Sequence, residues 1–445
     1  MSESTAEALA CSLVRLSYAD LTHATRSAAR RCVLDAIACA AAGFRHPTVR
    51  VASAWALSVF KDGPSAVWFT GQAGGASAVA FSNAFAASIL DLDDGHRAAL
   101  GHPGAAIIPA VFAEAGTSGA TAEAMLLAIV SGYEAGVGIA RSRHPDNLKV
   151  VATGRWSAIG VAAAVAKLRG LSSSQFREAL AIAESHSPNL VSADHAGFLG
   201  GDVKEGIPWS VITGIAAVDL AQTGMRGYPL ALDNPAMYRP GLAVPVVGSP
   251  LLIESTYFKR YACCRWIHSA IDAILAMGME HVPSEQIQAI EVATFERAAT
   301  LKNPACPEDI VAAQFSVPFA IALAYEQGAN ALLPIAESAL TDERVIRLAR
   351  KVRVFVDEEL ERAFPAQVPA RVKILASGRS IEREVRVPKG DPADPLTDSE
   401  LTAKAVRLTN GVWTESKTRE IACALLSSSG LSSASLSASL SQRSA

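Results

Sequence analysis

The amino-acid sequence predicts a mainly helical protein with an inserted α+β domain. A large all-helical domain would be formed by both chain ends, and a smaller domain would hold an antiparallel sheet. Apolar residues recur at helical spacing over most of the first 250 residues, alternate at strand spacing between 288 and 387, and return to helical spacing after the Pro/Gly/Asp-rich segment 388–395. We therefore place the helical domain at 1–254 and 394–445 and the α+β domain at 255–393.

The N-terminal half contains six segments with the apolar periodicity of helices. Glycine follows or ends several of them, and serines from residue 172 can cap another. The chain is 50% hydrophobic but only 6% aromatic, so its core must consist mainly of small aliphatic side chains, which let helices pack closely. The predicted helices cover 27–44, 76–94, 121–142, 157–170, 172–187 and 210–224.

The second half alternates apolar and polar residues in four short segments, as half-buried strands do. The sequence "ASGRS" at 376–380 predicts a hairpin turn between the last two. Thr397 and Glu400 have the spacing of a capping box, which marks the return to helix. The Ser-rich last residues predict a frayed tail. The predicted strands cover 288–295, 351–357, 370–375 and 382–387, with helices at 315–328 and 342–351.

Charge and composition exclude several classes of protein. The net charge is −3 and no block of basic residues is present, so we expect no nucleic-acid partner. No long uncharged apolar run predicts a membrane span, and the acidic N-terminus is unlike a signal peptide. Cys263 and Cys264 are adjacent, which is not the CxxC spacing of zinc or thioredoxin sites. We expect a cytoplasmic protein.

The stretch "LDLDDGHRAALGHPG" at 90–104 concentrates polar residues in an otherwise apolar region. As an EF-hand loop starting at Asp91, it would have glycine at position five and histidine at position twelve, which does not fit. Asp91, Asp93 and His96 could bind zinc, but no HExxH or Cys/His partner supports them. A polar loop that caps a helix remains an alternative. We favour an active-site loop without metal.

Two further segments carry cations. Lys204 stands in the glycine-flanked loop "GGDVKEG" at 200–206, where desolvation would lower its pKa and let it act as a base. The alternative is a solvated loop lysine. Near the predicted domain boundary, 257–273 contains cations that suit a carboxylate-bearing substrate or form a solvated basic face. These residues are Lys259, Arg260, Arg265 and His268.

Together these segments resemble the MmgE/PrpD family over nearly the whole chain. The acidic loop followed by His-Pro, the segment "SGYEAGVGIARS", the loop lysine Lys204 and "QFSVPFAIALA" at 314–324 each match a family motif. The resemblance implies a cleft between the two domains, a homodimer, and a small polycarboxylate substrate handled without a cofactor. A further motif is matched by Lys259, Tyr261, Cys264, His268 and Asp272.

Departures from the family pattern bear on the reaction. Val151 stands where dehydratase and decarboxylase members carry histidine, Phe319 stands where they carry tyrosine, and Gly95 stands where threonine is common. Eliminating water or releasing CO₂ needs a proton donor, and two are missing here. Epimerisation needs only removal and return of an α-proton. The pattern therefore resembles iminodisuccinate epimerase, an isomerase acting on an N-linked dicarboxylate.

Two rivals remain. One is a 2-methylcitrate-type dehydratase of the same family, whose missing acid would be supplied by His96 or Tyr261. The other is a catalytically inactive scaffold that binds a partner.

The epimerase hypothesis assigns roles to particular residues. Lys204 and His102 would transfer the proton, with Lys259 as a substitute. Asp93 would orient His102 or balance local charge. The residues expected to bind carboxylates are Arg97, Arg265 and His268.

Three further residues could contribute to the cleft. Tyr133 and Arg141 lie about 80° apart around a helix axis, so both can face the cleft, although a buried Tyr133 and a surface Arg141 are equally compatible with the pattern. Whether Arg155 enters the pocket is left open.

Overall fold

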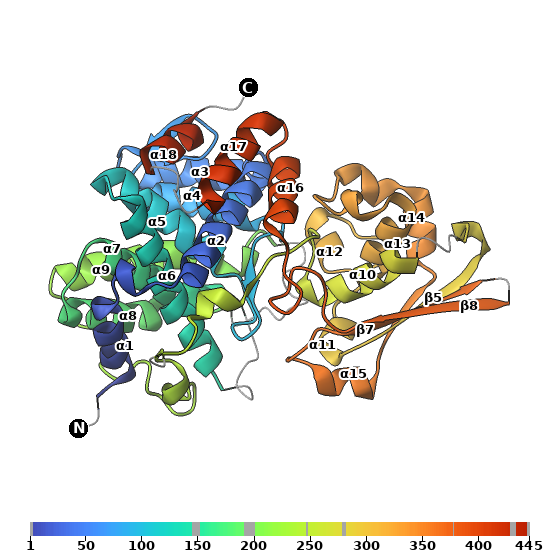
Figure 1. The fold of residues 1–445 in the computed structure, drawn as a ribbon, viewed down its shortest axis with the longest axis horizontal. Helices are drawn as coiled ribbons and strands as arrows, with labels where there is room; N and C mark the ends of the chain where they lie inside the picture. Colours follow the sequence, from blue (N-terminus) through green and yellow to red (C-terminus); the bar gives the residue numbers. More distant parts are fainter. Residues whose placement is uncertain are drawn as a thin grey trace.

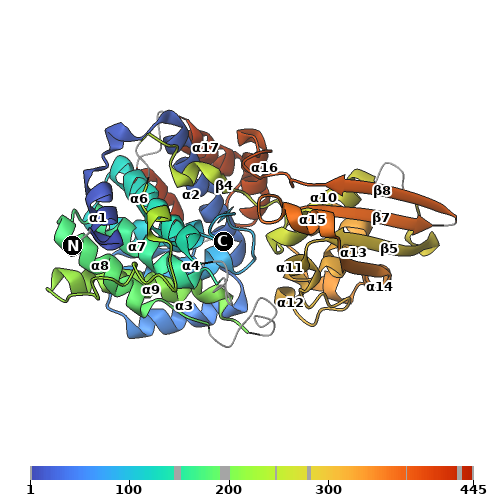
Figure 2. The same ribbon diagram turned by 90° about the horizontal axis from the view of Figure 1, so that it is seen from below.

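The computed structural model describes residues 3–144, 152–190, 201–245, 248–277, 282–376, 378–427 and 433–442. Helices account for 58% of these described residues, and a small sheet region accompanies them. Figures 1 and 2 show a large helical part at one end and a sheet with its own helices at the other. The first and last helices both belong to the helical part. The predicted mainly helical class with a smaller sheet-containing part is therefore confirmed.

The helical part takes nearly all its helices from the N-terminal half. Five of the six predicted helices agree with observed ones to within four residues at either end, whereas the helix predicted to reach residue 94 ends at Ser88 and leaves the acidic stretch in a turn. The helices are α1 (Thr5–Arg15), α2 (His23–Gly43), α3 (Pro47–Val59), α4 (Ala76–Ser88), α5 (Gly104–Ser118), α6 (Ala122–Ser142), α7 (Gly154–Leu168), α8 (Ser173–His186), α9 (Ile207–Gln222), α16 (Asp398–Leu408), α17 (Glu415–Leu426) and α18 (Ser433–Ser441).

Small residues bring the central helices α6 and α7 into backbone contact. A Cβ atom at Gly160 of α7 would lie 2.9 Å from the carbonyl oxygen of Gly132 in α6. This spacing is shorter than a carbon and an oxygen tolerate, so glycine is required there. The close packing follows from the low aromatic content of the sequence.

Helix α6 is long and apolar enough to cross a membrane by length and composition. However, 72% of its most apolar window is buried inside the protein. A core helix of a folded domain has the same properties. Packing against α7 accounts for its apolar character.

The sheet domain contains a four-stranded sheet in the order β6-β5-β7-β8. The strands are β5 (Ile287–Thr294), β6 (Val352–Val356), β7 (Ala370–Ala376) and β8 (Arg379–Val385). The expectation of an antiparallel sheet is wrong in one respect, because β5 and β6 pair in parallel. The chain between them forms a long helical crossover, which returns it to the same end of the sheet.

Helices accompany this sheet in the second domain. Figure 1 shows α10 and α13 lying along the sheet, with α15 on the other side of the strands. The helices are α10 (His268–Ala276), α11 (Glu296–Ala299), α12 (Ile310–Gln314), α13 (Val317–Gln327), α14 (Glu343–Ala349) and α15 (Glu358–Ala363). The boundaries 254/255 and 393/394 stay predictions.

Two short strand pairs lie within the helical part. One is a hairpin of β1 (Ser65–Val67) and β2 (Gln72–Gly74). The other joins β3 (Gly95–His96) to β4 (Thr256–Tyr257). The second pair matters for function, because it holds the acidic loop against the segment that carries Lys259.

The C-terminal helices pack onto the N-terminal ones. The capping box of Thr397 and Glu400 starts α16 as predicted. The Nζ atom of Lys404 in α16 lies 2.6 Å from Oδ1 of Asp35 in α2, and it donates a hydrogen bond of 2.8 Å to the carbonyl oxygen of Leu92. The expectation of a frayed tail is wrong for α18, since Leu440 is buried and accepts a backbone hydrogen bond from Phe69.

Replacing Lys404 should destabilise the protein strongly. Lys404 and Asp35 are both buried, and removing one partner of a buried ion pair leaves the other charge unpaired. We expect Lys404→Ala to lower the free energy of unfolding by about 3–5 kcal/mol in urea denaturation. The partly exposed Lys417 of α17 provides the control, because Lys417→Ala should change the free energy of unfolding by less than about 0.5 kcal/mol. Equal effects of the two variants would contradict the proposed role of the buried pair.

Candidate active site

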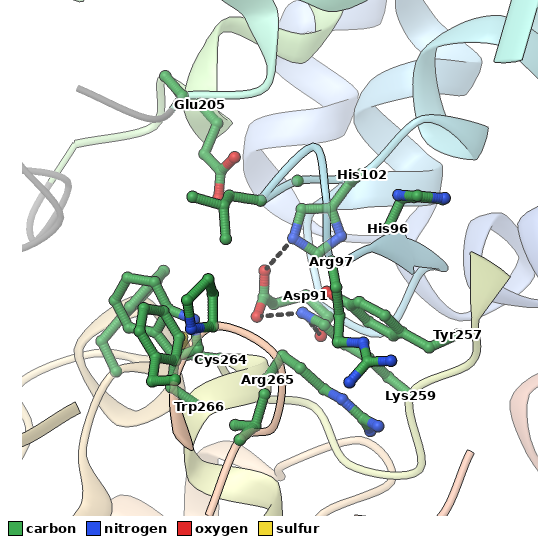
Figure 3. A pocket seen from close by; sticks show the side chains of 17 residues that line it. Asp91, His96, Arg97, His102, Glu205, Tyr257, Lys259, Cys264, Arg265 and Trp266 are labelled. Carbon is green, nitrogen blue, oxygen red and sulfur yellow. Dashed lines mark hydrogen bonds and ion pairs between the residues drawn. The ribbon is translucent and has the colours of Figure 1, made fainter. Parts of the chain in front are cut away.

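A pocket opens where the acidic loop meets the segment after β4. The stretch of the sheet domain after α15, with Phe364, Pro365 and Val368, also lines it. Its empty space is about 670 Å³, a volume that includes solvent at the open mouth. Figure 3 shows the side chains around it. The lining residues are Asp91, His96, Arg97, Leu100, Gly101, His102, Ala152, Glu205, Tyr257, Lys259, Cys264, Arg265, Trp266, Phe315, Phe364, Pro365 and Val368.

The carboxylate of Asp91 lies at the centre of the site and binds two ammonium groups. Its Oδ1 atom is 2.7 Å from Nζ of Lys204, and its Oδ2 atom is 2.7 Å from Nζ of Lys259. Lys259 also donates to the backbone carbonyl of Asp91 at 3.0 Å. Residues from three distant segments are thereby held at one point.

Charge determines the protonation of this cluster. Burial alone would raise the pKa of Asp91, but the charges of Lys204, Lys259 and His102 hold it well below its ordinary value. For Lys259, burial favours the neutral amine, yet the Asp91 carboxylate raises its pKa above the ordinary value. Asp91 is therefore an anion and Lys259 a cation at neutral pH.

Several residues around the pocket adopt left-handed backbone conformations. The φ angle is +53° at Asp91, +53° at Leu100, +37° at Lys204 and +54° at Glu205. Such conformations are unfavourable for residues other than glycine, asparagine and aspartate. Here the buried ion pairs hold Asp91 and Lys204 in place, and strain of this kind is typical of functional sites.

His102 is held in one orientation. Its Nδ1 atom lies 2.9 Å from the carbonyl oxygen of Asp94 and 3.4 Å from Oδ2 of Asp93. Because a carbonyl oxygen can only accept, Nδ1 carries a proton, and Nε2 faces the pocket 3.9 Å from Oδ1 of Asp91. Burial and Lys259 oppose protonation, but Asp93 and Glu205 raise the pKa of His102 above its ordinary value.

A threonine connects His102 to Glu205. The backbone N–H of His102 donates to Oγ1 of Thr153 at 3.1 Å, and this hydroxyl donates to Oε2 of Glu205 at 2.7 Å. The backbone N–H of Thr153 donates to the same carboxylate. The start of α7 therefore aligns the loop of Lys204 and Glu205 with the acidic loop.

Two guanidinium groups share one buried carboxylate. Nε of Arg97 lies 3.5 Å, and Nη2 of Arg265 lies 3.6 Å, from Oδ2 of Asp391. Arg97 also bonds the carbonyl of Ala366, and Arg265 bonds that of Pro388 at 3.1 Å. Asp391 lies in the segment that leads from β8 to α16, so both cations are held where the two domains meet.

Two other polar groups of the pocket wall are neutral at pH 7. Burial lowers the pKa of His96 to about 4, and its Nε2 atom lies 3.1 Å from the carbonyl of Leu252. Burial raises the pKa of the Cys264 thiol to about 12. The charged part of the pocket is therefore concentrated around Asp91 and Asp391.

The structure brings most of the predicted site residues together. His102, Lys259, Arg97 and Arg265 line the pocket. Three of the other five predicted residues reach it through a neighbour. Lys204 contacts Asp91, and Asp93 contacts His102. Nδ1 of His268 lies 3.3 Å from Nη1 of Arg265.

Other predicted residues are not brought to the pocket. The hydroxyl of Tyr133 donates to the carboxylate of Asp94, and Nε of Arg141 donates to the carbonyl of Leu242 at 2.6 Å. Arg155 forms two bonds of 2.7 Å with Glu184. Phe319 is fully buried and does not line the pocket. Val151 lies outside the described residues.

Several site residues were not assigned roles from the sequence. Asp91 was considered only as a metal ligand, while Asp93, two positions later, was assigned to the site. Glu205 adjoins Lys204 and could have been found from that position. Tyr257 and Asp391 gave no local signal, because their place depends on how β4 and the 388–395 segment fold back onto the acidic loop.

Asp91, His102 and Glu205 also form the one group among the described residues that could hold a metal ion. Each offers a ligand atom, and these atoms lie within 4.8 Å of one another. Both oxygens of Asp91 already bind ammonium groups. A cation would have to displace Lys204 from Oδ1, so this donor set suits ammonium better than metal.

Fold and pocket together define a class of protein. It is a helical protein with an inserted sheet domain, and ammonium, guanidinium and imidazole groups at the junction suit a small anion. Residues 7–239 match the MmgE/PrpD N-terminal domain, and residues 261–428 match the MmgE/PrpD C-terminal domain. The chain belongs to the MmgE/PrpD family.

Named relatives include cis-aconitate decarboxylases. The chain is 26% identical over 440 residues to that of Aspergillus terreus (strain NIH 2624 / FGSC A1156), covering 90% of this chain and 88% of the relative. It is 24% identical over 452 residues to the cis-aconitate decarboxylase-like protein oryM of Aspergillus oryzae, covering 93% and 92%. For the Homo sapiens cis-aconitate decarboxylase, identity is 26% over 316 residues, covering 64% and 62%. The family resemblance is confirmed, and the likeness to iminodisuccinate epimerase stays a prediction.

Neutralising Asp91 should disrupt the site. Asparagine tolerates the positive φ at this position, but it cannot neutralise two ammonium groups. We expect Asp91→Asn to lower the free energy of unfolding by about 3–5 kcal/mol, measured by chemical denaturation. Asp62 is exposed, and Asp62→Asn serves as the matched control. A stability of Asp91→Asn equal to that of Asp62→Asn would show that the double ion pair does not organise the fold.

Proposed function

We propose that this protein is an enzyme of the MmgE/PrpD family that epimerises a small N-linked dicarboxylate such as iminodisuccinate. It would remove and return the proton on the carbon next to a carboxylate, without a cofactor. The observation that carries the proposal is the convergence of Lys204 and His102 on Oδ1 of Asp91, at 2.7 and 3.9 Å. His102 lines the pocket together with Arg97 and Arg265, and Lys204 adjoins it through its contact with Asp91.

The arrangement supports a division of roles between the two groups. In neutral His102, the Nδ1–H group donates a hydrogen bond to the carbonyl oxygen of Asp94. The lone pair of Nε2 is therefore available to take an α-proton. The ammonium of Lys204 can return a proton to the planar carbanion from the other face. Lys259 and the two arginines would stabilise the negative charge that builds on the carboxylate. In the reverse direction, Lys204 and His102 exchange roles.

The second candidate is a decarboxylase acting on a tricarboxylate. The relatives named for cis-aconitate decarboxylation match about nine tenths of the chain and favour it. The same cations would bind the substrate, and protonated His102 would deliver a proton to carbon after CO₂ leaves. Against it stands the sequence expectation that Phe319 and Val151 replace two proton donors.

The dehydratase alternative receives less support from the geometry. His96, one possible acid, has a pKa of about 4 and is not protonated at pH 7. Tyr261, the other, donates its hydroxyl hydrogen to Asp272 at 2.6 Å and does not line the pocket.

Incubation with a panel of acids in D₂O tests the reaction. The panel contains iminodisuccinate, 2-methylcitrate and cis-aconitate. We expect the wild-type protein to place deuterium at Cα of recovered iminodisuccinate, measured by NMR, because epimerisation exchanges this hydrogen with solvent. CO₂ release from cis-aconitate without deuterium in recovered iminodisuccinate would favour the decarboxylase, and a new absorbance from an unsaturated acid would favour the dehydratase.

Substitutions test whether Lys204 and His102 carry out the hydrogen exchange. We expect Lys204→Ala and His102→Ala each to slow deuterium incorporation by about 10²-fold or more, since each removes a proton-transfer group. The exposed residues Lys302 and His23 provide controls, because Lys302→Ala and His23→Ala make the same changes away from the pocket. Exchange at the wild-type rate in either pocket variant would remove that residue from the mechanism.

The pH dependence should respond to Asp93. His102 acts as a base only when neutral, so kcat/KM should rise with pH through a pKa above the ordinary histidine value of 6.5. The carboxylate of Asp93 stabilises the imidazolium, and its removal lowers this pKa. In Asp93→Asn, a larger fraction of His102 is neutral at a given pH, and the acidic limb of the profile should move to lower pH. A limb that moves to higher pH or stays fixed would contradict the role of His102 as base.

A further inference from the structure

Tyr257 occupies space that a glycine leaves free. It is the second residue of β4 and pairs directly with Gly95 of β3. A Cβ atom at Gly95 would lie 2.3 Å from both Cζ and the hydroxyl oxygen of Tyr257. These distances exclude any side chain at position 95 while the tyrosine ring stays in place. Gly95 and Tyr257 are therefore structurally coupled.

The hydroxyl of Tyr257 is a hydrogen-bond donor in the pocket wall. Tyr257 lines the pocket and is 5% exposed. Among the described residues, no hydrogen-bond partner of this hydroxyl is found. The guanidinium of Arg265 lies 4.6 Å from the ring centroid. Burial raises the pKa of the phenol above its ordinary value, so the hydroxyl keeps its hydrogen at neutral pH. Figure 3 shows Tyr257 among the side chains around the pocket.

Unlike the hydroxyl of Tyr257, the cationic groups at the pocket already have protein partners. Lys204 and Lys259 are bonded to Asp91, and Arg97 and Arg265 are paired with Asp391. A bound carboxylate must share these cations with protein carboxylates. The phenol can offer its hydrogen to a ligand without giving up a protein partner.

We propose that the hydroxyl of Tyr257 donates a hydrogen bond to a carboxylate oxygen of the bound acid, and that Gly95 makes room for it. The inference rests on the proposed function only in that the ligand is a small polycarboxylate. An acceptor oxygen supplied by the ligand would give this hydroxyl the charge-assisted hydrogen bond that no described residue provides. Tyr257 is therefore a residue that determines specificity for carboxylates.

The direct test removes only the phenolic oxygen. Tricarballylate, a saturated tricarboxylate, is titrated into wild-type protein and Tyr257→Phe, and its dissociation constant is measured by calorimetry. We expect binding about tenfold weaker or more in the variant, as for a lost hydrogen bond to a charged group. Tyr325, whose hydroxyl bonds the carbonyl of Val282 in the sheet domain, provides the control, because Tyr325→Phe removes a phenolic oxygen away from the pocket.

A second variant tests the coupling between the two residues. Gly95→Ala should weaken binding at least as much as Tyr257→Phe, because its Cβ displaces the ring. In a Tyr257→Ala background the space is free, and Gly95→Ala should then cost little further affinity. Circular dichroism and urea denaturation establish that each variant is folded.

The outcomes separate this inference from the proposed function. If wild-type protein binds tricarballylate and Tyr257→Phe binds it equally well, the role of Tyr257 is overturned while the function stands. Equal losses from Gly95→Ala in both backgrounds would overturn the coupling. If wild-type protein binds neither tricarballylate nor any acid of the panel, the proposed function fails and the inference fails with it.

Discussion

The site depends on one buried carboxylate that neutralises two lysines. Asp91 and Lys259 are each 1% exposed, and neither could remain charged at such a depth without the other. Lys204 completes the cluster from a loop more than a hundred residues away in sequence. These ion pairs fix how three segments lie relative to one another: the acidic loop, the turn before α9 and the segment after β4. The pocket lies where these segments meet.

A second buried carboxylate pairs with two cations at the domain junction. Asp391 is 1% exposed and pairs with Arg97 from the acidic loop and Arg265 from the segment before α10. The two carboxylates keep four cations close together without strong mutual repulsion. Cations paired in this way can still bind a small anion, because they are charged and held close together.

Much of the fold could be predicted from periodicity alone. Helices with one polar face, such as α8, and strands with alternating burial, such as β7, carry their own pattern. Helix α5 could not be predicted in this way, because it is apolar on all sides and contains Pro109. Proline is unfavourable in the interior of a helix. The parallel pairing of β5 with β6 also gave no local signal, since it depends on the path of the crossover between them.

The chemistry of the site could be predicted more easily than its geometry. Lysine, arginine and histidine in an apolar chain indicated an anionic ligand, and His102, Lys259, Arg97 and Arg265 do line one pocket. Choosing among three neighbouring aspartates was not possible, because Asp91 and Asp93 differ only in where their side chains point after folding. Tyr133 and Arg141 share a helix, but their partners lie in other segments that turn them away from the pocket.

The contact between Lys404 and the carbonyl of Leu92 limits how far the chain can fold during its synthesis. The acidic loop emerges from the ribosome early, but the lysine that anchors it emerges about three hundred residues later. Until then Asp35 is a carboxylate without its cation. The nascent N-terminal domain therefore cannot complete its active-site loop, and a competent pocket is acquired only when translation is nearly finished.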